Sequence, residues 1–139
     1  MTVEQARLIE IRKIKDSRGS LSVIEHSSDV PFEIKRIYYM HDIAEGADRG
    51  HHAMKTQFKF LIAIHGKFDV VLKDGKNEKV FHLKERNQGL LIPGGLWREM
   101  KNFSTGAVCL VLADEIFVEE DHIRDYPSFL EYRNLLSKF

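Results

Sequence analysis

Short apolar runs, separated by turn-forming residues, follow one another from residue 32 to residue 113. They read IKRIYYM, FKFLIAIHG, KFDVVLKDG, KVFHL, GLLIPGG and AVCLVLA. Runs of this length, rich in β-branched and aromatic residues and closely spaced, are typical of strands in a β-sandwich or barrel. The middle of the chain therefore predicts an all-β fold.

Two further patterns place a hairpin and a helix. In VVLKDGKNEKVFHL, Asp74 and Gly75 offer the positive φ angles that a tight turn needs between two alternating runs, which predicts a β-hairpin. In DHIRDYPSFLEYRNLLSKF, apolar residues at near-helical spacing follow Pro127, a residue favoured in the first helical turn. No repeat, low-complexity tract or linker marks a boundary, so we expect a single domain over residues 1–139 with one short C-terminal helix.

Composition and charge exclude several classes of protein. The 139 residues include 21 Lys and Arg against 21 Asp and Glu, so no net charge attracts the chain to nucleic acid or to an anionic membrane. No apolar run approaches the roughly 20 residues of a membrane span, and the start, MTVEQARLIEIRKIK, lacks the apolar core of a signal peptide. We expect a cytoplasmic protein with no nucleic-acid or membrane partner. Its single cysteine, Cys109, is expected to be buried and unreactive.

The pair of adjacent histidines in RGHHAMK is the first candidate for chemistry. If a strand begins near His51, alternation places one set of side chains on one face: His52, Met54, Phe58 and Phe60. This aromatic-rich face should point inward. His52 would then lie on an apolar inner wall, where a neutral imidazole can exchange protons near pH 7. The alternative is a histidine that only completes the core or its rim.

The arrangement HxM followed by PGGLWREMKN resembles the two signature motifs of the cupin superfamily, the double-stranded β-helix or jelly-roll proteins. Metal-binding cupins supply His-x-His and Glu from the first motif and His from the second. Here His52 is retained, whereas Met54, Phe58 and Arg98 occupy the other ligand positions. A thioether, a phenyl ring and a cation do not replace two imidazoles and a carboxylate around a divalent metal, so we expect a metal-free cavity.

A closer resemblance extends from residue 16 to residue 132. The chain is similar to the dTDP-4-keto-6-deoxyglucose 3,4-ketoisomerases, cupins of nucleotide-sugar pathways, in the segments DSRGSL, VPFEIKRIYY, RGHHAMK, LIAIHGKFDVVLKDG, LWREMKNFS and EEDHIRDYPSFLEY. The resemblance implies a jelly-roll homodimer, often with an N-terminal strand exchanged between subunits. It also implies that a dTDP-linked keto sugar binds in the mouth of the barrel without a metal.

The same resemblance assigns roles to individual residues. The family signature is RGxHAHK, and its first histidine corresponds to His52, which makes His52 the catalytic acid–base candidate. The second histidine is replaced by Met54, which carries no proton. In the related 3,5-epimerases, with RGLH, one histidine at this position suffices as the base. Tyr38 matches an active-site tyrosine that hydrogen-bonds a sugar oxygen, and Arg49 corresponds to a residue that holds the diphosphate.

Three further residues complete the expected substrate-binding set. Arg18, in DSRGSL, would contact phosphate or nucleotide from the neighbouring subunit, although the alternative is simply a turn. Trp97 and Arg98 lie in the second motif. Trp97 is either cavity wall or core, and Arg98 could stabilise negative charge on the substrate. No role is assigned to the isolated histidines His65, His82 and His122.

The resemblance thus predicts an isomerase that moves a carbonyl group between adjacent sugar carbons. The C4 ketone acidifies the C3 proton, and a base that removes it and returns a proton to C4 leaves the ketone at C3. No redox cofactor is needed, because the electrons move only within the substrate. Two alternatives remain open: an epimerase or isomerase acting on a related nucleotide sugar, and a binding domain for dTDP-sugars without catalytic activity.

Overall fold

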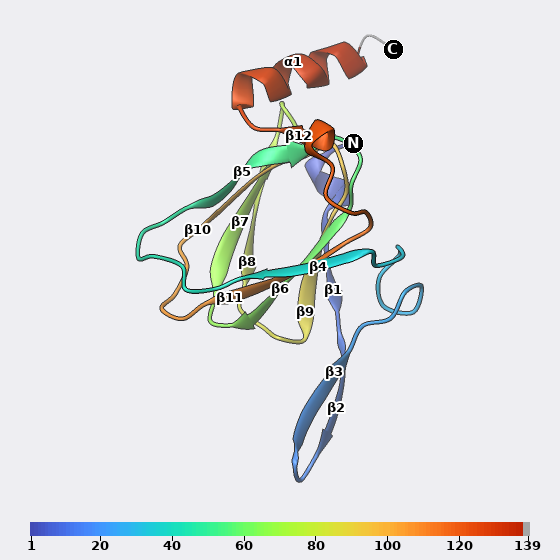
Figure 1. The fold of residues 1–139 in the computed structure, drawn as a ribbon, viewed down its shortest axis with the longest axis vertical. Coiled ribbons are helices and arrows are strands. Elements are labelled where there is room, and N and C mark those ends of the chain that lie inside the picture. Colours follow the sequence, from blue (N-terminus) through green and yellow to red (C-terminus); the bar gives the residue numbers. More distant parts are fainter. Residues whose placement is uncertain (138–139) are drawn as a thin grey trace.

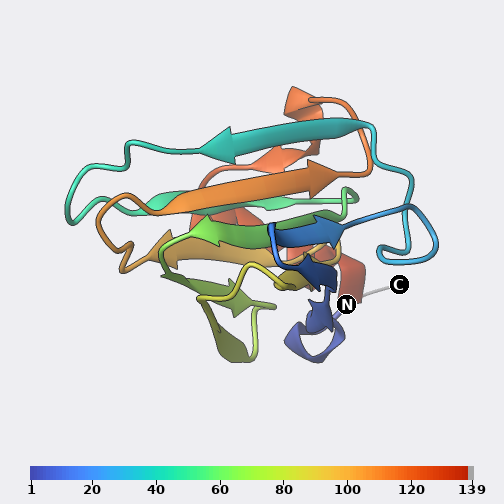
Figure 2. The ribbon, with the colours of Figure 1, turned by 90° about the horizontal axis from the view of Figure 1, so that it is seen from below.

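Two five-stranded antiparallel sheets face each other around a common apolar core in the computed structural model, which describes residues 1–137 (Figure 1). Figure 2, viewed from the opposite end to the helix, shows β4, β11 and β6 side by side in the first sheet. The strands of the first sheet, in spatial order, are β1 (Arg7–Glu10), β9 (Gln88–Ile92), β6 (Lys59–His65), β11 (Val108–Ala113) and β4 (Arg36–Met40). The second sheet contains β12 (His122–Ile123), β5 (Arg49–Met54), β10 (Trp97–Lys101), β7 (Phe68–Lys73) and β8 (Glu78–Leu83). The predicted all-β jelly roll is confirmed.

Both faces of the first sheet are apolar, which explains the continuous apolar run in β6. Leu61 points into the core between the sheets, where it meets residues of the second sheet such as Leu72 and Met100. Phe60 and Ile62 point outward into a second cluster that segments before β4 cover. Alternate residues of one strand are therefore buried on opposite sides. Cys109 is buried as predicted, and burial raises the pKa of its thiol to about 12.

The two-residue alternation expected from His52 to Phe60 is wrong beyond Met54. The chain leaves the second sheet after Met54 and enters the first sheet at Lys59, and the intervening corner breaks the alternation. Phe58 and Phe60 consequently belong to the outer cluster. Lys59 occupies an inward position instead, because the residue before an outward side chain faces the other way.

Charged and short strands account for the elements that the apolar pattern did not single out. The runs predicted between residues 32 and 113 correspond to β4, β6, β7, β8, β9 and β11. The pattern missed β1, β10 and a hairpin of β2 (Arg12–Asp16) and β3 (Gly19–Val23), whose sequences mix charged or small residues with the apolar ones. The strands β1, β2 and β3 are mostly exposed, whereas β10 is largely buried but includes charged residues. Hydrophobic runs alone reveal neither kind of strand.

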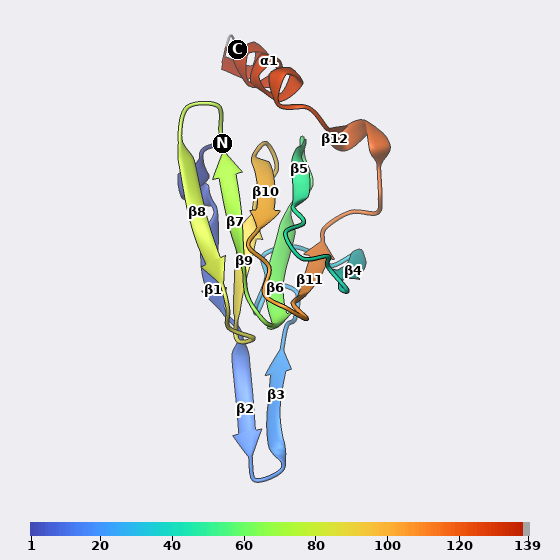
Figure 3. The ribbon, with the colours of Figure 1, turned by 90° about the vertical axis from the view of Figure 1, so that its left-hand side faces the viewer.

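The β2–β3 hairpin forms a separate two-stranded sheet that projects from the barrel, at the end opposite to the helix (Figures 1 and 3). Every residue of β2 is exposed, and Ile14 and Leu21 are 61% and 59% exposed. Large apolar side chains paired on a projecting hairpin are typical of surfaces that a partner covers.

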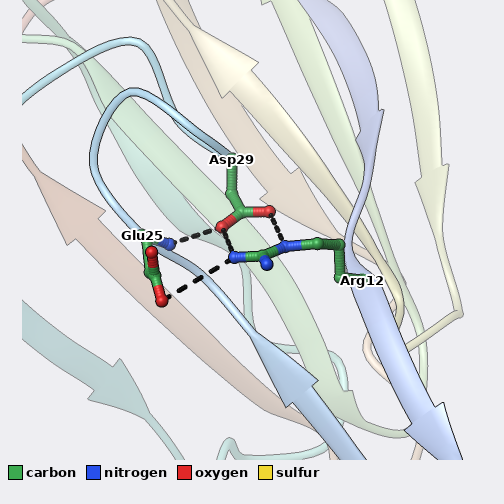
Figure 4. Close-up of polar contacts among 3 residues, drawn as sticks. All are labelled: Arg12, Glu25 and Asp29. Atoms are coloured by element: carbon green, nitrogen blue, oxygen red, sulfur yellow. Dashed lines mark hydrogen bonds and ion pairs between the residues drawn. The ribbon is translucent and has the colours of Figure 1, made fainter.

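An ion pair fixes the base of this hairpin. Arg12 donates from Nε and Nη2 to the two carboxylate oxygens of Asp29, at 2.8 and 2.6 Å, and the backbone N–H of Glu25 donates to the same carboxylate at 2.7 Å (Figure 4). The guanidinium holds the pKa of Asp29 below its ordinary value. Bidentate geometry restricts direction as well as distance, so the hairpin is oriented relative to the segment that follows it.

The predicted hairpin and helix are both present. A loop at residues 74–77 joins β7 and β8, Gly75 has a φ of +95°, and the Asp74 carboxylate accepts hydrogen bonds from backbone N–H groups of the loop. The helix α1 (Tyr126–Ser137) follows Asp125, whose carboxylate accepts a hydrogen bond from the N–H of Ser128. Two short 3₁₀ helices are η1 (Val3–Gln5) and η2 (Glu119–Asp121). Among residues 1–137, no helix is long and apolar enough to cross a membrane.

Candidate active site

A cavity of about 400 Å³ lies between the two sheets. The first sheet contributes Tyr38, Leu61 and Val111 to its wall, and the second sheet contributes Arg49, His52 and Arg98. The cavity thus combines an apolar wall with a few converging polar groups, as sites for small molecules do. Four of the predicted site residues line this cavity: Tyr38, Arg49, His52 and Arg98.

A β-bulge explains how Arg49 and His52 reach the same cavity. His52 lies opposite Arg98 on β10, but Gly50 lies opposite the next residue, Glu99, so His51 is an extra residue in β5. Gly50 and His51 have φ angles of +85° and +57°, the left-handed conformation that such a bulge uses. Because of this extra residue, Arg49 and His52 both line the cavity although they are separated by an odd number of positions.

Burial keeps the imidazole of His52 uncharged. Desolvation, reinforced by the positive charge of Arg98, lowers the pKa of His52 to about 3. The ring of His122 lies 5.6 Å away, centroid to centroid, and its Nδ1 lies 2.9 Å from the carbonyl oxygen of Val118, to which it donates. A neutral imidazole at pH 7 can accept a proton, and an anionic ligand in the cavity would raise its proton affinity. No sequence pattern indicates a role for His122, because its proximity to His52 arises only from the pairing of β12 with β5.

The guanidinium of Arg98 lacks the partners that a buried cation requires. Arg98 is 3% exposed, and its Nε and Nη2 are buried without a hydrogen-bond partner within residues 1–137, as is Nε of Arg36. Burial lowers the pKa of Arg98 to about 10, which leaves it charged at neutral pH. Burying an unpaired charge is unfavourable, so this arrangement favours a ligand that supplies negative charge or acceptor oxygens.

A lysine behind the cavity is a polar group that the sequence analysis missed. Lys59 is 1% exposed, and its Nζ lies 3.1 Å from Tyr38 Oη. Burial and the charge of Arg98 lower the pKa of Lys59 to about 7, and burial raises the pKa of Tyr38 above its ordinary value. The available signal was a lone lysine inside the apolar run FKFLIAI.

Two nominated residues lie outside the cavity. Trp97 points to the opposite face of β10, where it packs with Phe129 and Tyr126 of α1 and donates from Nε1 to Glu99 at 2.9 Å. This corrects its place in the substrate-binding set in favour of the core alternative, because adjacent strand residues face opposite ways. The side chain of Arg18, at the tip of the β2–β3 hairpin, is 89% exposed and bound to Asp16 at 2.7 Å.

The donor set around His52 does not fit the metal that many cupins hold. Within residues 1–137, no three His, Cys, Asp or Glu side chains lie together as a metal site. His52 instead faces the cation Arg98 across the strand pair, and Met54 is fully buried. A guanidinium opposite the single imidazole repels a divalent ion, so this set of side chains is suited to acid–base chemistry and not to holding a metal.

Comparisons with known proteins converge on one class. Residues 4–134 match the family model described as "FdtA: WxcM-like, C-terminal". A TDP-4-oxo-6-deoxy-alpha-D-glucose-3,4-oxoisomerase of Aneurinibacillus thermoaerophilus is 39% identical over 126 residues, 91% of each chain. A crystal structure of a 3,4-ketoisomerase from Helicobacter canadensis is 43% identical, with a TM-score of 0.91 over 94% of this chain and 98% of that one. The sugar 3,4-ketoisomerase QdtA from Thermoanaerobacterium thermosaccharolyticum, in complex with TDP, is 36% identical, with a TM-score of 0.92 over 96% and 98%. A mutant of QdtA has been crystallised with TDP-4-keto-6-deoxyglucose.

Proposed function

This chain belongs to the FdtA family and is a sugar 3,4-ketoisomerase, and on that premise we propose that it converts TDP-4-keto-6-deoxyglucose into a TDP-3-keto-6-deoxyhexose, with His52 as its acid–base group. TDP is the thymidine nucleotide otherwise written dTDP. The observation that carries the assignment of His52 is its position: a neutral imidazole directly opposite a buried, unpaired arginine on the wall of the cavity. A base and a fixed positive charge are the two elements that enolisation requires.

The cations of the cavity suit the charged part of this substrate. Arg49 stands on the wall of the cavity, and its planar guanidinium can bind two phosphate oxygens at once, which an ammonium does not. We assign the diphosphate to Arg49. Arg98, deeper and almost inaccessible to solvent, is assigned to the sugar oxygens, where charge develops during the reaction.

The reaction then needs only one side chain that takes the proton from C3 and returns a proton to C4. His52 removes the C3 proton, which the neighbouring C4 ketone acidifies. The electron pair of the C–H bond forms a C3–C4 double bond, and a carbonyl electron pair moves onto the C4 oxygen, which gives an enediolate. The imidazolium then returns a proton to C4, the C3 hydroxyl loses its proton as it becomes the ketone, and the C4 oxygen gains one, so protons and electrons balance without a redox cofactor. Tyr38 donates a hydrogen bond to a sugar oxygen, and Arg98 stabilises the enediolate charge. Met54 is fully buried and takes only a packing role.

We further propose that the working unit is a homodimer with exchange of the N-terminal hairpin. The support is the projecting β2–β3 hairpin, with Ile14 and Leu21 largely exposed, and its orientation by the ion pair of Arg12 with Asp29. In such a dimer Arg18, too far along the hairpin to line the cavity of its own chain, would contribute to the cavity of the partner. Exchange would also cover an apolar surface that is unfavourable in water.

Incubation with TDP-4-keto-6-deoxyglucose in heavy water tests the proposed reaction. Proton NMR should show the appearance of a 3-keto product with deuterium at C4, and deuterium at C3 in the substrate that is re-formed by the reverse reaction. Exchange at another carbon, or epimerisation without movement of the carbonyl, would identify a different isomerase. Binding of TDP without any exchange would identify a binding domain and contradict the proposed reaction.

A further inference from the structure

Lys59 lies in the second layer of the cavity wall, next to a residue that lines the cavity. In the register of the first sheet, Lys59 and Arg36 both pair with Ala113 of β11, and Tyr38 pairs with Val111. Tyr38 lines the cavity, and its hydroxyl oxygen lies 3.1 Å from Nζ of Lys59. No carboxylate within residues 1–137 lies within ion-pair distance of that Nζ, so its one close polar contact in the described chain is the tyrosine.

The direction of this hydrogen bond determines what Tyr38 can offer to a ligand. A lysine ammonium has three donors and no acceptor, so the phenolic oxygen of Tyr38 must accept from it. The hydroxyl proton of Tyr38 can then be donated to another acceptor, and because Tyr38 lines the cavity, an oxygen of a bound ligand can be that acceptor. A neutral amine can accept instead, in which case the hydroxyl of Tyr38 can turn towards Lys59 and away from the ligand.

We propose that Lys59 is a positioning residue for the isomerisation, which holds Tyr38 with its hydroxyl proton directed at the oxygens of the substrate. The inference rests on the proposed function. Moving a carbonyl from C4 to C3 requires an exchange of protons on oxygen as well as on carbon: the oxygen at C3 loses its proton and the oxygen at C4 gains one. Tyr38 gives its proton to the C4 oxygen and recovers the one released from the C3 oxygen, while the Lys59 ammonium stabilises the transient phenolate. The proton count is the same before and after.

Charged neighbours make the arrangement sensitive to pH. The groups that act on Lys59 are Tyr38 and Arg36 from β4, Arg98 from β10, His52 from β5, Asp114 after β11 and Asp121 in η2. Burial and the two arginines disfavour the ammonium, and the two aspartates favour it, with a resulting pKa of about 7. The pKa of His52, about 3, leaves it neutral above pH 6, and the arginines remain charged. The active form of Lys59 is the ammonium, so kcat/KM should fall as the pH rises through about 7.

Kinetics of three variants test this role. Lys59→Met should lower kcat by roughly 10²-fold, the size of effect seen when one donor to a developing oxyanion is lost, with TDP affinity within about 3-fold of wild type. Lys59→Arg should retain most of kcat and lose the alkaline limb near pH 7, because a guanidinium stays charged. Lys55→Met is the matched control: Lys55 is exposed, close in sequence and outside the cavity, so its pH profile should equal that of wild type.

Each outcome decides the proposal. An alkaline limb that persists in Lys59→Arg, or a wild-type profile without such a limb, overturns it. So does Lys59→Met with wild-type kcat. If Lys59→Met does not fold, the pH profile of Lys59→Arg is the deciding measurement. If neither variant folds, Tyr38→Phe, which removes only the hydroxyl, must lack the alkaline limb near pH 7. If the wild-type protein does not isomerise TDP-4-keto-6-deoxyglucose, the proposed function is refuted. If the wild type is active and the Lys59 variants are unaffected, only the role of Lys59 is refuted.

Discussion

Burial gives His52 and Arg98 different chemical roles, although the two residues face each other. It lowers the pKa of His52 to about 3 and that of Arg98 to about 10. At pH 7 the imidazole is therefore neutral and able to accept a proton, whereas the guanidinium is still charged and able to stabilise an anion. The two groups take different roles because the ordinary pKa of an arginine is far above that of a histidine, although the same desolvated site lowers both.

Arg49 should govern nucleotide affinity. Arg49→Ala removes a charge-assisted contact worth about 1.5 kcal/mol at an exposed position, so the Kd for TDP should rise roughly 10-fold. Isothermal titration calorimetry with TDP measures this directly. Arg86→Ala removes another exposed arginine, one that does not line the cavity, and should leave the Kd unchanged. Equal affinities for both variants would show that the diphosphate binds elsewhere.

Met54 should tolerate an apolar substitution. It is fully buried, and Met54→Leu nearly conserves volume, so the free energy of unfolding should change by less than about 1.5 kcal/mol. Turnover should stay close to wild type, since a thioether transfers no proton. Urea denaturation and steady-state kinetics test both statements. A large loss of kcat at unchanged stability would mean that Met54 contacts the substrate.

At the scale of elements, the pairing of β5 with β10 determines which residues share the cavity. Alternation along β5 alone is enough to place His52 on an inner face, and it correctly predicts the burial of Met54. It does not reveal the bulge at His51, because a bulge is a property of two paired strands. The position of Lys59 was missed for a similar reason: the corner after Met54 resets the alternation, and only the tertiary structure shows where it restarts.

The sequence was most informative where a residue's environment is local. The turn at Asp74 and Gly75 and the start of α1 after Asp125 depend on neighbours in the chain, and those elements were predicted. Trp97 was harder, because core and cavity wall both suit a large aromatic residue, and only the register of β10 shows which face it takes. The motif resemblance supplied the identity of the site, and the structure supplied its geometry.

Gly50 should be essential for the bulge. A Cβ at this position would lie 3.1 Å from the carbonyl oxygen of Arg98, and the φ of +85° disfavours any other residue. Gly50→Ala should reduce stability by about 1–2 kcal/mol and reduce kcat further, because it displaces the strand that carries Arg98. Gly46→Ala is the control, since Gly46 has a φ of +76° but no atom within 4 Å of an added Cβ. Equal kcat in the two variants would contradict the role of the bulge.

At the scale of the whole molecule, the barrel and the projecting hairpin have separate functions in this account. The barrel holds the cavity, and the hairpin, which projects from the barrel in Figure 3, carries Arg18 and the exposed Ile14 and Leu21. The homodimer that would use this hairpin is a proposal. The assignment of residues 1–139 to a single domain and the cytoplasmic location stay predictions.

Mixing two impaired variants tests whether Arg18 acts across the dimer. Arg18→Ala and His52→Asn should each be impaired as homodimers. In a mixed dimer one cavity receives both wild-type residues, so refolding an equimolar mixture should restore about a quarter of wild-type activity by random pairing. Activity that does not exceed the sum of the separate variants would place Arg18 at its own subunit's site or outside any site.

Turnover of TDP-4-keto-6-deoxyglucose by His52→Asn, measured together with TDP affinity, shows whether His52 is the acid–base group. Asparagine keeps a polar side chain of similar size but accepts no proton at neutral pH. We expect kcat to fall by ~10²–10⁴-fold, as when a general base is lost, while the Kd for TDP stays within about 3-fold of wild type. Near-wild-type turnover in a folded, TDP-binding variant would contradict this assignment, and Tyr38 would become the leading candidate for the base.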